Sequence, residues 1–394
     1  MKMDPDRGLL RAPVSPDVLV VGARVAGAAT ALHLARAGYE VLVVDRIGPP
    51  SDTISTHALM RSGVLQLQRA GVLDRIIGAG TPAIDQVALV FDQERVDFAV
   101  ADEFGVDAYY APRRTVLDAA LLEAAVAAGA TFLPGVSVTG VMRGDGGRVE
   151  GISARSSLGD LSISARHVVG ADGTNSKIAR SVGAANSFYS EPTNSVAYAY
   201  FQGIEARGYE FHFVYRRNVG LIPTNDGLTL VFVGGPLGEA PVDSAESMMG
   251  TLRRVAPDLA EAILGAERVG RFYRANGIPN LLREPAGDGW TLVGDASFTE
   301  DPIAAHGITD ALRDADLCAE AVDVSLRDPA RAVGARTTYR AVRDSFARPL
   351  LEATVALAAY GWDGEEASRL LRRIGEVAEA ECQLLENRSS FALA

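Results

Sequence analysis

Three short stretches of the sequence carry residue types that bind a dinucleotide. The first, VGARVAG at residues 21–27, places Gly22 and Gly27 around a tight turn, with Arg24 where such turns often have a glycine. Glycines let the backbone and the next helix approach closely, and the N–H groups at the start of that helix can bind a pyrophosphate. The Arg24 guanidinium could pair with the same pyrophosphate. Asp45, at the end of the following apolar run, can accept both hydroxyls of a ribose.

The other two stretches each place an aspartate directly after a predicted buried strand. GADGTNSKIAR at residues 170–180 contains Asp172, and VGDAS at residues 293–297 contains Asp295. Ligands of open α/β sheets bind at the carboxyl ends of the strands, which favours a binding role for both side chains. Each aspartate has a structural alternative, because either could cap a following helix.

The elements that position these residues follow from the apolar spacing. Residues 18–21 are predicted as a buried parallel strand, residues 25–37 as a helix and the run that ends at Asp45 as a second strand, which together form one βαβ unit. Further helices are predicted over 57–70, 114–128, 244–254, 350–360 and 365–385. Strands are predicted as a hairpin over 84–100, a meander over 136–142, 149–154 and 161–165, a buried strand over 168–171 and a series between 194 and 235.

Composition excludes several classes of protein. The 394 residues are 48% hydrophobic and 22% charged, which is typical of an ordinary globular protein. The net charge of −12 disfavours nucleic acid as a binding partner. Two cysteines, Cys318 and Cys382, predict neither a disulfide framework nor a metal site. The first 16 residues are predicted as a disordered lead-in. Since no signal peptide or membrane span is found, a cytoplasmic location is expected.

Taken together and in this order, the three stretches resemble the FAD-dependent monooxygenase superfamily, over residues 17–325. These are the single-component aromatic hydroxylases with a glutathione-reductase-like FAD domain, together with their geranylgeranyl reductase-like relatives. The resemblance implies an α/β fold: a glutathione-reductase-type, Rossmann-like FAD-binding domain with an inserted mixed β-sheet substrate domain and C-terminal helices. Residues 218–226, NVGLIPTND, lack the GWxWxIP motif of flavin-dependent halogenases, which disfavours chlorination.

The resemblance also assigns domains. It implies a discontinuous FAD-binding domain, a substrate-binding β-sheet domain and a C-terminal helical segment. The FAD-binding domain would comprise residues 17–80, 108–187 and 270–328, the substrate domain residues 81–107 and 188–269, and the helical segment residues 329–394. The C-terminal helices could cover the substrate pocket or form the surface of a homodimer.

Cofactor contacts carry over residue by residue. Asp45 is implied to bind the adenosine ribose, Asp172 to lie near the pyrophosphate and Asp295 to bind the ribityl chain. Arg114 matches an arginine that approaches the cofactor from its helix, and the backbone of Val138 matches the position that faces the adenine. The full predicted set is Gly22, Arg24, Ala26, Gly27, Asp45, Arg46, Arg114, Val138, Asp172, Gly173, Gly294, Asp295, Pro302 and Gly307.

Two segments near the implied flavin depart from the family pattern. The family has a PxxGxG stretch where this chain has Pro302, Ala305, His306 and Gly307, and the segment around His57 lacks the usual arginine. His57 and His306 are the catalytic candidates, since a histidine can deprotonate a phenol near neutral pH. Either could instead be a hydrogen-bond partner of the cofactor.

The strands between residues 194 and 235 are predicted to supply the substrate pocket, with Tyr200, His212 and Phe213 in its wall; core packing is the alternative. The resemblance then implies an NAD(P)H-consuming monooxygenase of secondary metabolism. It would hydroxylate or epoxidise an aromatic or polyene-like small molecule through a flavin hydroperoxide, with FAD bound, NADPH or NADH as transient reductant and O2 as co-substrate. The alternatives are an FAD-dependent reductase or dehydrogenase and a flavin-binding protein without activity.

Overall fold

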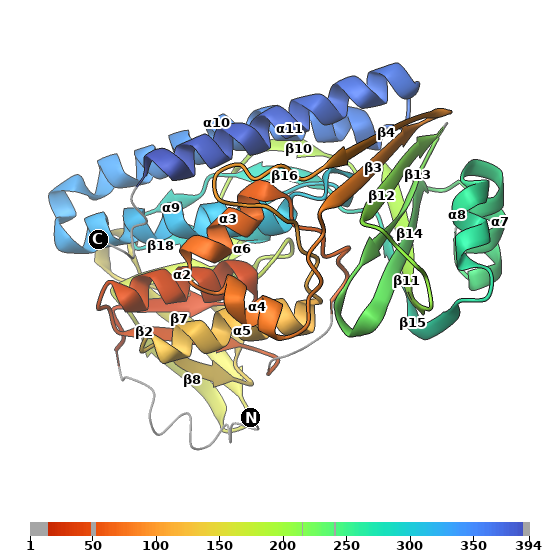
Figure 1. The fold of residues 1–394 in the computed structure, drawn as a ribbon. Coiled ribbons are helices and arrows are strands. Elements are labelled where there is room, and N and C mark those ends of the chain that lie inside the picture. Colours follow the sequence, from red (N-terminus) through yellow and green to blue (C-terminus); the bar gives the residue numbers. More distant parts are fainter. Residues whose placement is uncertain (1–14, 49–52, 215, 240–241, 389–394) are drawn as a thin grey trace.

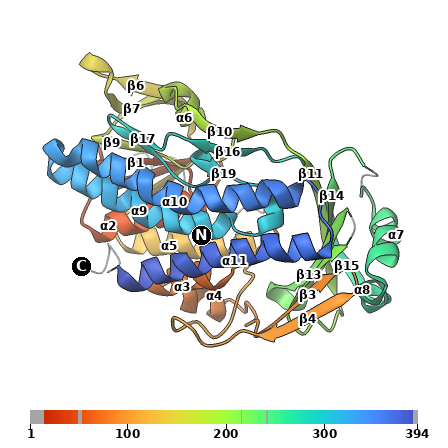
Figure 2. The same ribbon diagram turned by 90° about the horizontal axis from the view of Figure 1, so that it is seen from above.

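The computed structural model describes residues 15–48, 53–214, 216–239 and 242–388. Most of the predicted lead-in, residues 1–14, lies outside these ranges. Three parts make up the molecule: a parallel sheet with its helices, a larger mixed sheet beside it and two long C-terminal helices that run across both (Figures 1 and 2). The described helices include none with the length and apolarity of a membrane span.

The predicted βαβ unit forms the centre of the six-stranded sheet. Its strand order is β17 (Ala286–Gly287), β18 (Trp290–Leu292), β9 (His167–Gly170), β1 (Val18–Val21), β2 (Val41–Asp45) and β5 (Thr131–Pro134). All neighbours are parallel except β17 and β18. The strands are mostly apolar because both faces of the sheet are covered, as in other parallel sheets.

Side chains on the two faces of this sheet belong to different cores. On one face Val18 and Val20 pack with the helices α2 (Val25–Arg36), α5 (Arg114–Ala127) and α9 (Gly307–Arg327). On the other face Leu19 and Val21 pack against the predicted meander, which is β6 (Ser137–Arg143), β7 (Val149–Ser156) and β8 (Gly159–Ser164). The alternation along one short strand therefore anchors both layers.

The second large sheet has seven strands. Its order is β15 (Glu267–Asn276), β11 (Asn194–Gln202), β14 (Leu228–Pro236), β13 (Arg217–Pro223), β12 (Tyr209–Val214), β3 (Gln86–Phe91) and β4 (Glu94–Ala99). The pairing is antiparallel except between β12 and β3, so the sheet is mixed. The predicted hairpin over 84–100 therefore joins strands that follow more than one hundred residues later in the chain.

Each face of the seven-stranded sheet has its own cover. The outer face packs against α7 (Ala245–Val255) and α8 (Pro257–Ile263). The inner face packs against α10 (Ala332–Ala358) and α11 (Gly364–Asn387), which are longer than the helices predicted over 350–360 and 365–385. A small sheet connects the two large ones; its strands are β10 (Asn186–Ser190), β16 (Asn280–Arg283) and β19 (Phe298–Thr299).

The helix predicted over 57–70 is wrong in its first part. The structure begins α3 (Arg61–Arg69) at Arg61, and α4 (Leu73–Gly78) follows it. The residues before α3 are held outside a helix because Leu59 pairs with Tyr110 in an isolated β-bridge and His57 has a left-handed backbone, with φ of 68°. Backbone pairing with a distant segment overrides the local apolar spacing here.

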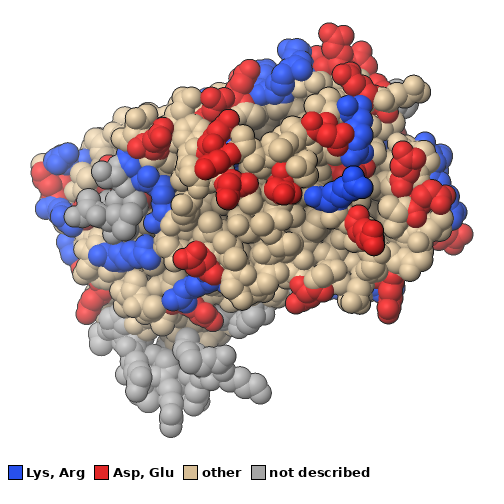
Figure 3. Space-filling view, viewed as in Figure 1, with Lys and Arg blue, Asp and Glu red and all other residues tan. Residues whose placement is uncertain are grey.

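Charged side chains of both signs are scattered over the face shown in Figure 3, between larger areas of other residues. On the face shown in Figure 3, Lys and Arg alternate with Asp and Glu rather than gathering in one basic area. This distribution fits the acidic net charge of −12 and gives no reason to expect a polyanionic partner at that face.

Candidate functional site

The turn between β1 and α2 is pressed against the end of β9. Gly22 has φ of 109°, and a Cβ added there would lie 2.3 Å from the carbonyl oxygen of Ala171. A Cβ on Gly27 would lie 1.9 Å from the carbonyl oxygen of Gly22. Contacts this short leave no room for a side chain at either position. The first and second stretches of the sequence therefore lie side by side.

Arg24 sits where the turn would otherwise carry a glycine, and the backbone accommodates it without strain. It is the N-cap residue of α2, with extended dihedral angles of φ −85° and ψ −169°. Its side chain is exposed, and its Nη1 atom donates to Oγ1 of Thr53 at 3.0 Å. The first turn of α2 contains no acidic residue. The N–H groups and the positive dipole end of that turn thus directly follow a basic residue, and an anion would be favoured there.

Asp45 is fixed beside the same turn. Its Oδ2 atom accepts the backbone N–H of Ala23 at 2.8 Å, and its Oδ1 atom accepts that of Ile47 at 2.9 Å. Each carboxylate oxygen can accept a further hydrogen bond. The side chain is half-buried at the end of β2 and so can still receive ribose hydroxyls. Arg46 follows it on the surface.

Asp295 brings the third stretch to the same place. Its side chain is reachable by solvent, yet it is crowded by protein atoms, and this desolvation raises its pKa; the charges of Arg114 and Arg24 act in the opposite direction. Thr174, from the second stretch, donates to Oδ2 of Asp295 at 3.4 Å. Residues from all three stretches therefore converge around one carboxylate.

Arg114 is held by a close ion pair. Its guanidinium donates to both carboxylate oxygens of Asp118, at 2.9 and 3.1 Å, and both side chains are almost fully buried. Burial raises the pKa of Asp118, and the charge of Arg114 opposes that rise. The ion pair with Asp118 thus holds the Arg114 guanidinium as a fixed positive charge near Asp295.

The Asp172 carboxylate caps a helix. Its Oδ2 atom accepts the N–H groups of Lys177 and Ile178 at 2.6 and 3.1 Å, at the start of α6 (Lys177–Val182), and its Oδ1 atom accepts the hydroxyl of Ser176 at 2.6 Å. The structural alternative for this side chain is therefore the one observed. Its backbone nitrogen nevertheless lies 3.3 Å from the Cβ position built on Gly22, so the residue adjoins the dinucleotide turn.

The remaining predicted cofactor residues are placed by packing. A Cβ on Gly294 would lie 2.6 Å from that of Ala26, so the third stretch packs directly on α2. Gly173 has a left-handed backbone with φ of 79°. Val138 lies in β6 opposite Ala154 and packs against the core beneath the meander. Contacts of these residues with a cofactor stay predictions.

The segment with the altered PxxGxG pattern keeps a glycine-like backbone. Residues Pro302–Ala304 form one 3₁₀ turn, and Asp301 caps it by accepting the N–H of Ile303 at 3.0 Å. Ala305 follows with φ of 52°, a left-handed conformation that glycine adopts more easily. Gly307 starts α9 with no heavy atom within 4 Å of its built Cβ. Ala305 therefore adopts a backbone conformation that a glycine at this position could also adopt.

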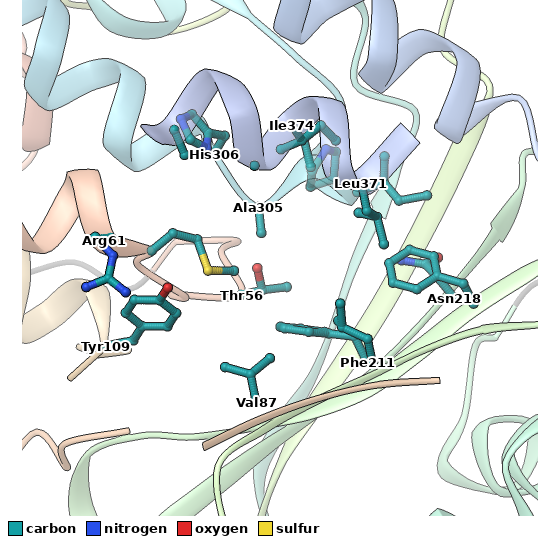
Figure 4. Close-up of a pocket in the computed structure, with 18 of the residues that line it drawn as sticks. Thr56, Arg61, Val87, Tyr109, Phe211, Asn218, Ala305, His306, Leu371 and Ile374 are labelled. Atoms are coloured by element: carbon teal, nitrogen blue, oxygen red, sulfur yellow. The ribbon is translucent and has the colours of Figure 1, made fainter. Parts of the chain in front are cut away.

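A cavity of about 370 Å³ lies next to this segment (Figure 4). Phe211 and Val87 of the seven-stranded sheet form one wall, Leu371 and Ile374 of α11 form the opposite wall, and Ala305 lies on a third side. The volume is in the range of small-molecule sites, and the walls are mostly apolar.

Two of the three predicted pocket residues do not line this cavity. Phe213 does, together with Phe211 on the same face of β12. His212 points to the opposite face, where its ring bonds Glu210 at 2.7 Å, so its assignment to the pocket is corrected by the alternation of the strand. Tyr200 lies farther along β11 and contacts His57 instead.

His57 is buried behind the cavity wall. Its Nε2 atom lies 2.5 Å from the hydroxyl of Tyr200, and the two rings are parallel with centroids 6.0 Å apart. The neighbouring residue Thr56 is the one that faces the cavity. A left-handed backbone at a histidine is unusual and is maintained by the surrounding contacts. Tyr200 thus fixes the orientation of the His57 ring.

His306 belongs to a buried ionic network, defined here as His306, Asp310, Arg313, Asp314 and Glu381. His306 Nε2 lies 3.0 Å from Oε2 of Glu381. Burial alone would lower the pKa of His306, but the carboxylates of Glu381 and Asp310 outweigh it and raise the pKa to about 9. The ring is therefore protonated at neutral pH. This corrects its candidacy as a general base.

The same network brings three potential metal ligands within 4.8 Å of one another: His306, Asp310 and Glu381. Arg313 already occupies the space between the carboxylates. Its Nη1 atom donates to Asp310 at 2.6 Å and to Glu381. The guanidinium supplies the positive charge that a cation would bring, so the arrangement is that of an ion-pair network.

Sequence reasoning predicted a pocket on the sheet strands with Phe213 in its wall, but it did not identify the other walls of the cavity. Its lining comes from separated segments, among them Thr56, Tyr109, Phe211, Ala305 and Ile374. The apolar stripe of α11 was the one sequence signal for the missing wall. It predicted that this helix covers either a pocket or another copy of the chain. The structure shows that α11 lines the cavity.

We expect Arg24→Ala to weaken FAD binding about tenfold or more, with a steeper loss at low salt, because a charge-assisted contact to the pyrophosphate is removed. Equilibrium titration of the apoprotein with FAD measures this. Arg36→Ala, at the exposed other end of α2, is the matched control. Equal affinities for FAD in both variants would remove the assigned role of Arg24.

Comparison with known proteins agrees with this geometry. A family model described as FAD binding domain matches residues 15–354. The probable electron transfer flavoprotein-quinone oxidoreductase YdiS of Escherichia coli K12 is 37% identical over 179 residues, which cover 42% of this chain and 38% of that protein. The match thus spans well under half of YdiS. Digeranylgeranylglycerophospholipid reductase 1 of Methanopyrus kandleri is 28% identical over 315 residues, covering 75% of this chain and 77% of the reductase.

Solved structures show the same fold. PqsL of P. aeruginosa, in complex with 2-aminobenzoylacetate, has a TM-score of 0.77 and 22% identity, with 91% of this chain and 100% of that chain covered. A triple mutant of the flavin-dependent brominase Bmp2 has a TM-score of 0.79 and 18% identity, with 96% and 97% covered. At these identities the likeness concerns the fold alone.

Proposed function

Because the chain belongs to the FAD binding domain family, we propose that it is an FAD-dependent monooxygenase that consumes NADPH or NADH and O2. Its substrate would be an apolar small molecule, aromatic or polyene-like, which it hydroxylates or epoxidises. The observation that carries the proposal is the apolar cavity beside the 302–307 segment, the segment that faces the flavin in the resembling family. A cavity of this kind can hold an apolar molecule away from water.

The chain's residues fit FAD. The turn at Gly22 and Gly27 has no room for side chains, and the start of α2 offers N–H groups and Arg24 to a pyrophosphate. Asp45 has acceptor capacity left for a ribose. Asp295, accessible but desolvated, suits the hydroxyls of a ribityl chain. The cofactor would extend from Asp45 past Asp295 toward the 302–307 segment.

When bound, FAD supplies the redox chemistry, in which a hydride from NAD(P)H is used to activate O2. The chain contributes orientation and a dry site. Phe211 and Ile374 hold a flat substrate between opposite walls, and α11 closes one side. His57, oriented by Tyr200, is the remaining candidate for proton transfer, because His306 is already protonated within its ion pair. Since His57 lies behind the cavity wall, it would act through a bridging group rather than by direct contact with the substrate.

A flavin-dependent reductase is the second candidate. The observation that favours it is the match to digeranylgeranylglycerophospholipid reductases over 75% of this chain. Such an enzyme would place an isoprenoid chain in the apolar cavity and saturate its double bonds without O2. Both candidates use the same cavity and cofactor.

Turnover with and without oxygen separates the two. The purified holoenzyme is supplied with NADPH or NADH and a panel of aromatic and polyene compounds, aerobically and in an anaerobic chamber. For a monooxygenase, a compound that stimulates NAD(P)H oxidation is converted only in the aerobic sample. Conversion at the same rate in the anaerobic sample would contradict the proposal and favour the reductase.

A further inference from the structure

The end of the cavity opposite Arg61 and Tyr109 holds Asn218 (Figure 4). Asn218 belongs to a buried chain of hydrogen bonds that begins behind the 302–307 segment. Asn194 donates its Nδ2 to Oδ1 of Asp301 at 2.8 Å. The Tyr360 hydroxyl oxygen lies 2.8 Å from Oδ1 of Asn194 and 2.5 Å from the atom placed as Oδ1 of Asn218. All four side chains are at least nine-tenths buried.

The number of available donors determines the direction of the hydrogen bonds that link Asp301, Asn194 and Tyr360. Asp301 also accepts the backbone N–H of Ile303 at 3.0 Å, and although burial raises its pKa to about 6, it is ionised at neutral pH. An ionised carboxylate only accepts, so Asn194 must present Nδ2 to it. The carbonyl oxygen of Asn194 then faces Tyr360 and takes the one proton that the hydroxyl can donate.

The same count determines the orientation of Asn218. The placed orientation would have the single Tyr360 proton serve both Asn194 and Asn218. Because that proton is used by Asn194, we infer that the Asn218 amide is turned over, so that its Nδ2 donates to the Tyr360 oxygen. The oxygen and nitrogen of a side-chain amide are distinguished by their hydrogen-bond partners. The carbonyl oxygen of Asn218 therefore takes the other position. Within the described ranges the atom in that position has no hydrogen-bond partner, and it is not sealed off from solvent. Because Asn218 lines the cavity, we infer that this atom faces the cavity.

Tyr360 is held in place at some conformational cost. It lies in the turn between α10 and α11 and has a left-handed backbone, with φ of 53°. Glycine adopts this conformation more easily, but in this turn the glycine is the next residue, Gly361. Left-handed conformations at bulky residues persist where surrounding contacts determine them. The two hydrogen bonds of its hydroxyl are such contacts. Tyr360 is thus the positioning residue for Asn218.

We propose that Asn218 is a specificity-determining residue, whose amide oxygen accepts a hydrogen bond from an O–H or N–H group of the substrate. The inference rests on the proposed role of the cavity as the substrate site. Phe211 and Ile374 would hold a planar apolar body, and its donor group would lie at the Asn218 end. The favoured class is an aromatic compound with a phenolic hydroxyl or a ring N–H. A molecule without a donor leaves a desolvated carbonyl unpaired, which is costly.

A matched pair of probes tests this. Binding of 2-naphthol and of 2-methoxynaphthalene to the FAD-loaded enzyme is measured by isothermal titration calorimetry at neutral pH. We expect 2-naphthol to bind about tenfold tighter or more, because only it donates a hydrogen bond. Asn218→Ala brings the ratio of the two affinities close to one. Tyr360→Phe lowers the ratio while Asn218 is retained, because the amide is no longer oriented.

Val196→Ala is the control variant, because Val196 lines the same cavity without a polar group. It changes both affinities together and leaves their ratio unchanged. A wild-type ratio near one, or a high ratio that survives both Asn218→Ala and Tyr360→Phe, would overturn the inference. Failure of both probes to bind would overturn it as well.

One further variant separates this failure from that of the proposed function. Ile374→Trp fills the cavity and should abolish binding of both probes while FAD is retained. If it does so but the ratio does not depend on Asn218, only the specificity role is lost. If both probes bind Ile374→Trp as they bind the wild type, the cavity is not the binding site, and the proposed function loses its supporting observation along with this inference.

Discussion

Replacing Gly27 with alanine is expected to yield a protein without bound FAD. The added Cβ would lie 1.9 Å from the carbonyl oxygen of Gly22 and 3.1 Å from the Cβ of Ala171, so α2 must move away from β1. The start of α2 would then no longer point its N–H groups at a pyrophosphate. We expect at least about 100-fold weaker FAD binding and a loss of about 1–3 kcal/mol or more in the free energy of unfolding from overpacking.

Gly250→Ala is the matched control for this substitution. Gly250 lies within α7, and no heavy atom is within 4 Å of its built Cβ. Alanine there should leave FAD binding unchanged and stabilise the helix by about 0.5–1 kcal/mol. The readouts are the FAD content of the purified protein and titration of the apoprotein. Stoichiometric FAD in Gly27→Ala would show that the turn does not hold the cofactor as described.

The second large effect is expected at Glu381. This buried carboxylate accepts hydrogen bonds from His306 in the segment before α9, from Arg313 in α9 and from Ser62 in α3. Glu381→Ala leaves His306 and Arg313 buried without their shared partner, and removal of one member of such a network typically costs about 3–5 kcal/mol. Chemical denaturation measures the loss. Glu376→Ala, at an exposed position of the same helix, should change stability by less than about 1 kcal/mol.

The pH dependence of stability provides a second readout for this network. The pKa of His306 is raised from 6.5 to about 9 in the folded protein. Its contribution to stability is therefore complete below pH 6.5 and is lost as the pH rises through 9. In Glu381→Gln the largest source of the rise is removed, and the decline over this interval should become shallower. An unchanged pH profile in Glu381→Gln would show that the two side chains are not paired.

The sequence predicted the dinucleotide turn because its determinants are local. Gly22, Gly27 and Asp45 lie within one βαβ unit, where spacing alone determines which atoms meet. The meander and the β3–β4 hairpin were predicted for the same reason. By contrast, the role of the Asp172 carboxylate had two local solutions, and only the positions of Lys177 and Ile178 show that it caps a helix.

The wall of the cavity opposite the sheet and the buried ionic network could not be predicted in this way. Both depend on α11, which follows the 302–307 segment by about 60 residues and returns to lie beside it. His306 was a reasonable proton acceptor from its type and position, but Glu381 inverts that assignment by keeping it protonated. The assignment of His212 to the pocket was wrong. Which face of β12 meets the cavity depends on how the sheet packs against the rest of the protein, and the sequence of one strand does not show this.

The most direct test of the central claim is the fate of the oxygen atoms of O2. The holoenzyme is given NADPH or NADH and a compound that stimulates their oxidation, under ¹⁸O2, and the product is analysed by mass spectrometry. A monooxygenase places one ¹⁸O atom in each product molecule, and Ile374→Trp, which fills the cavity, forms no labelled product. Unlabelled product, with hydrogen added across a double bond or oxygen derived from water, would contradict the account.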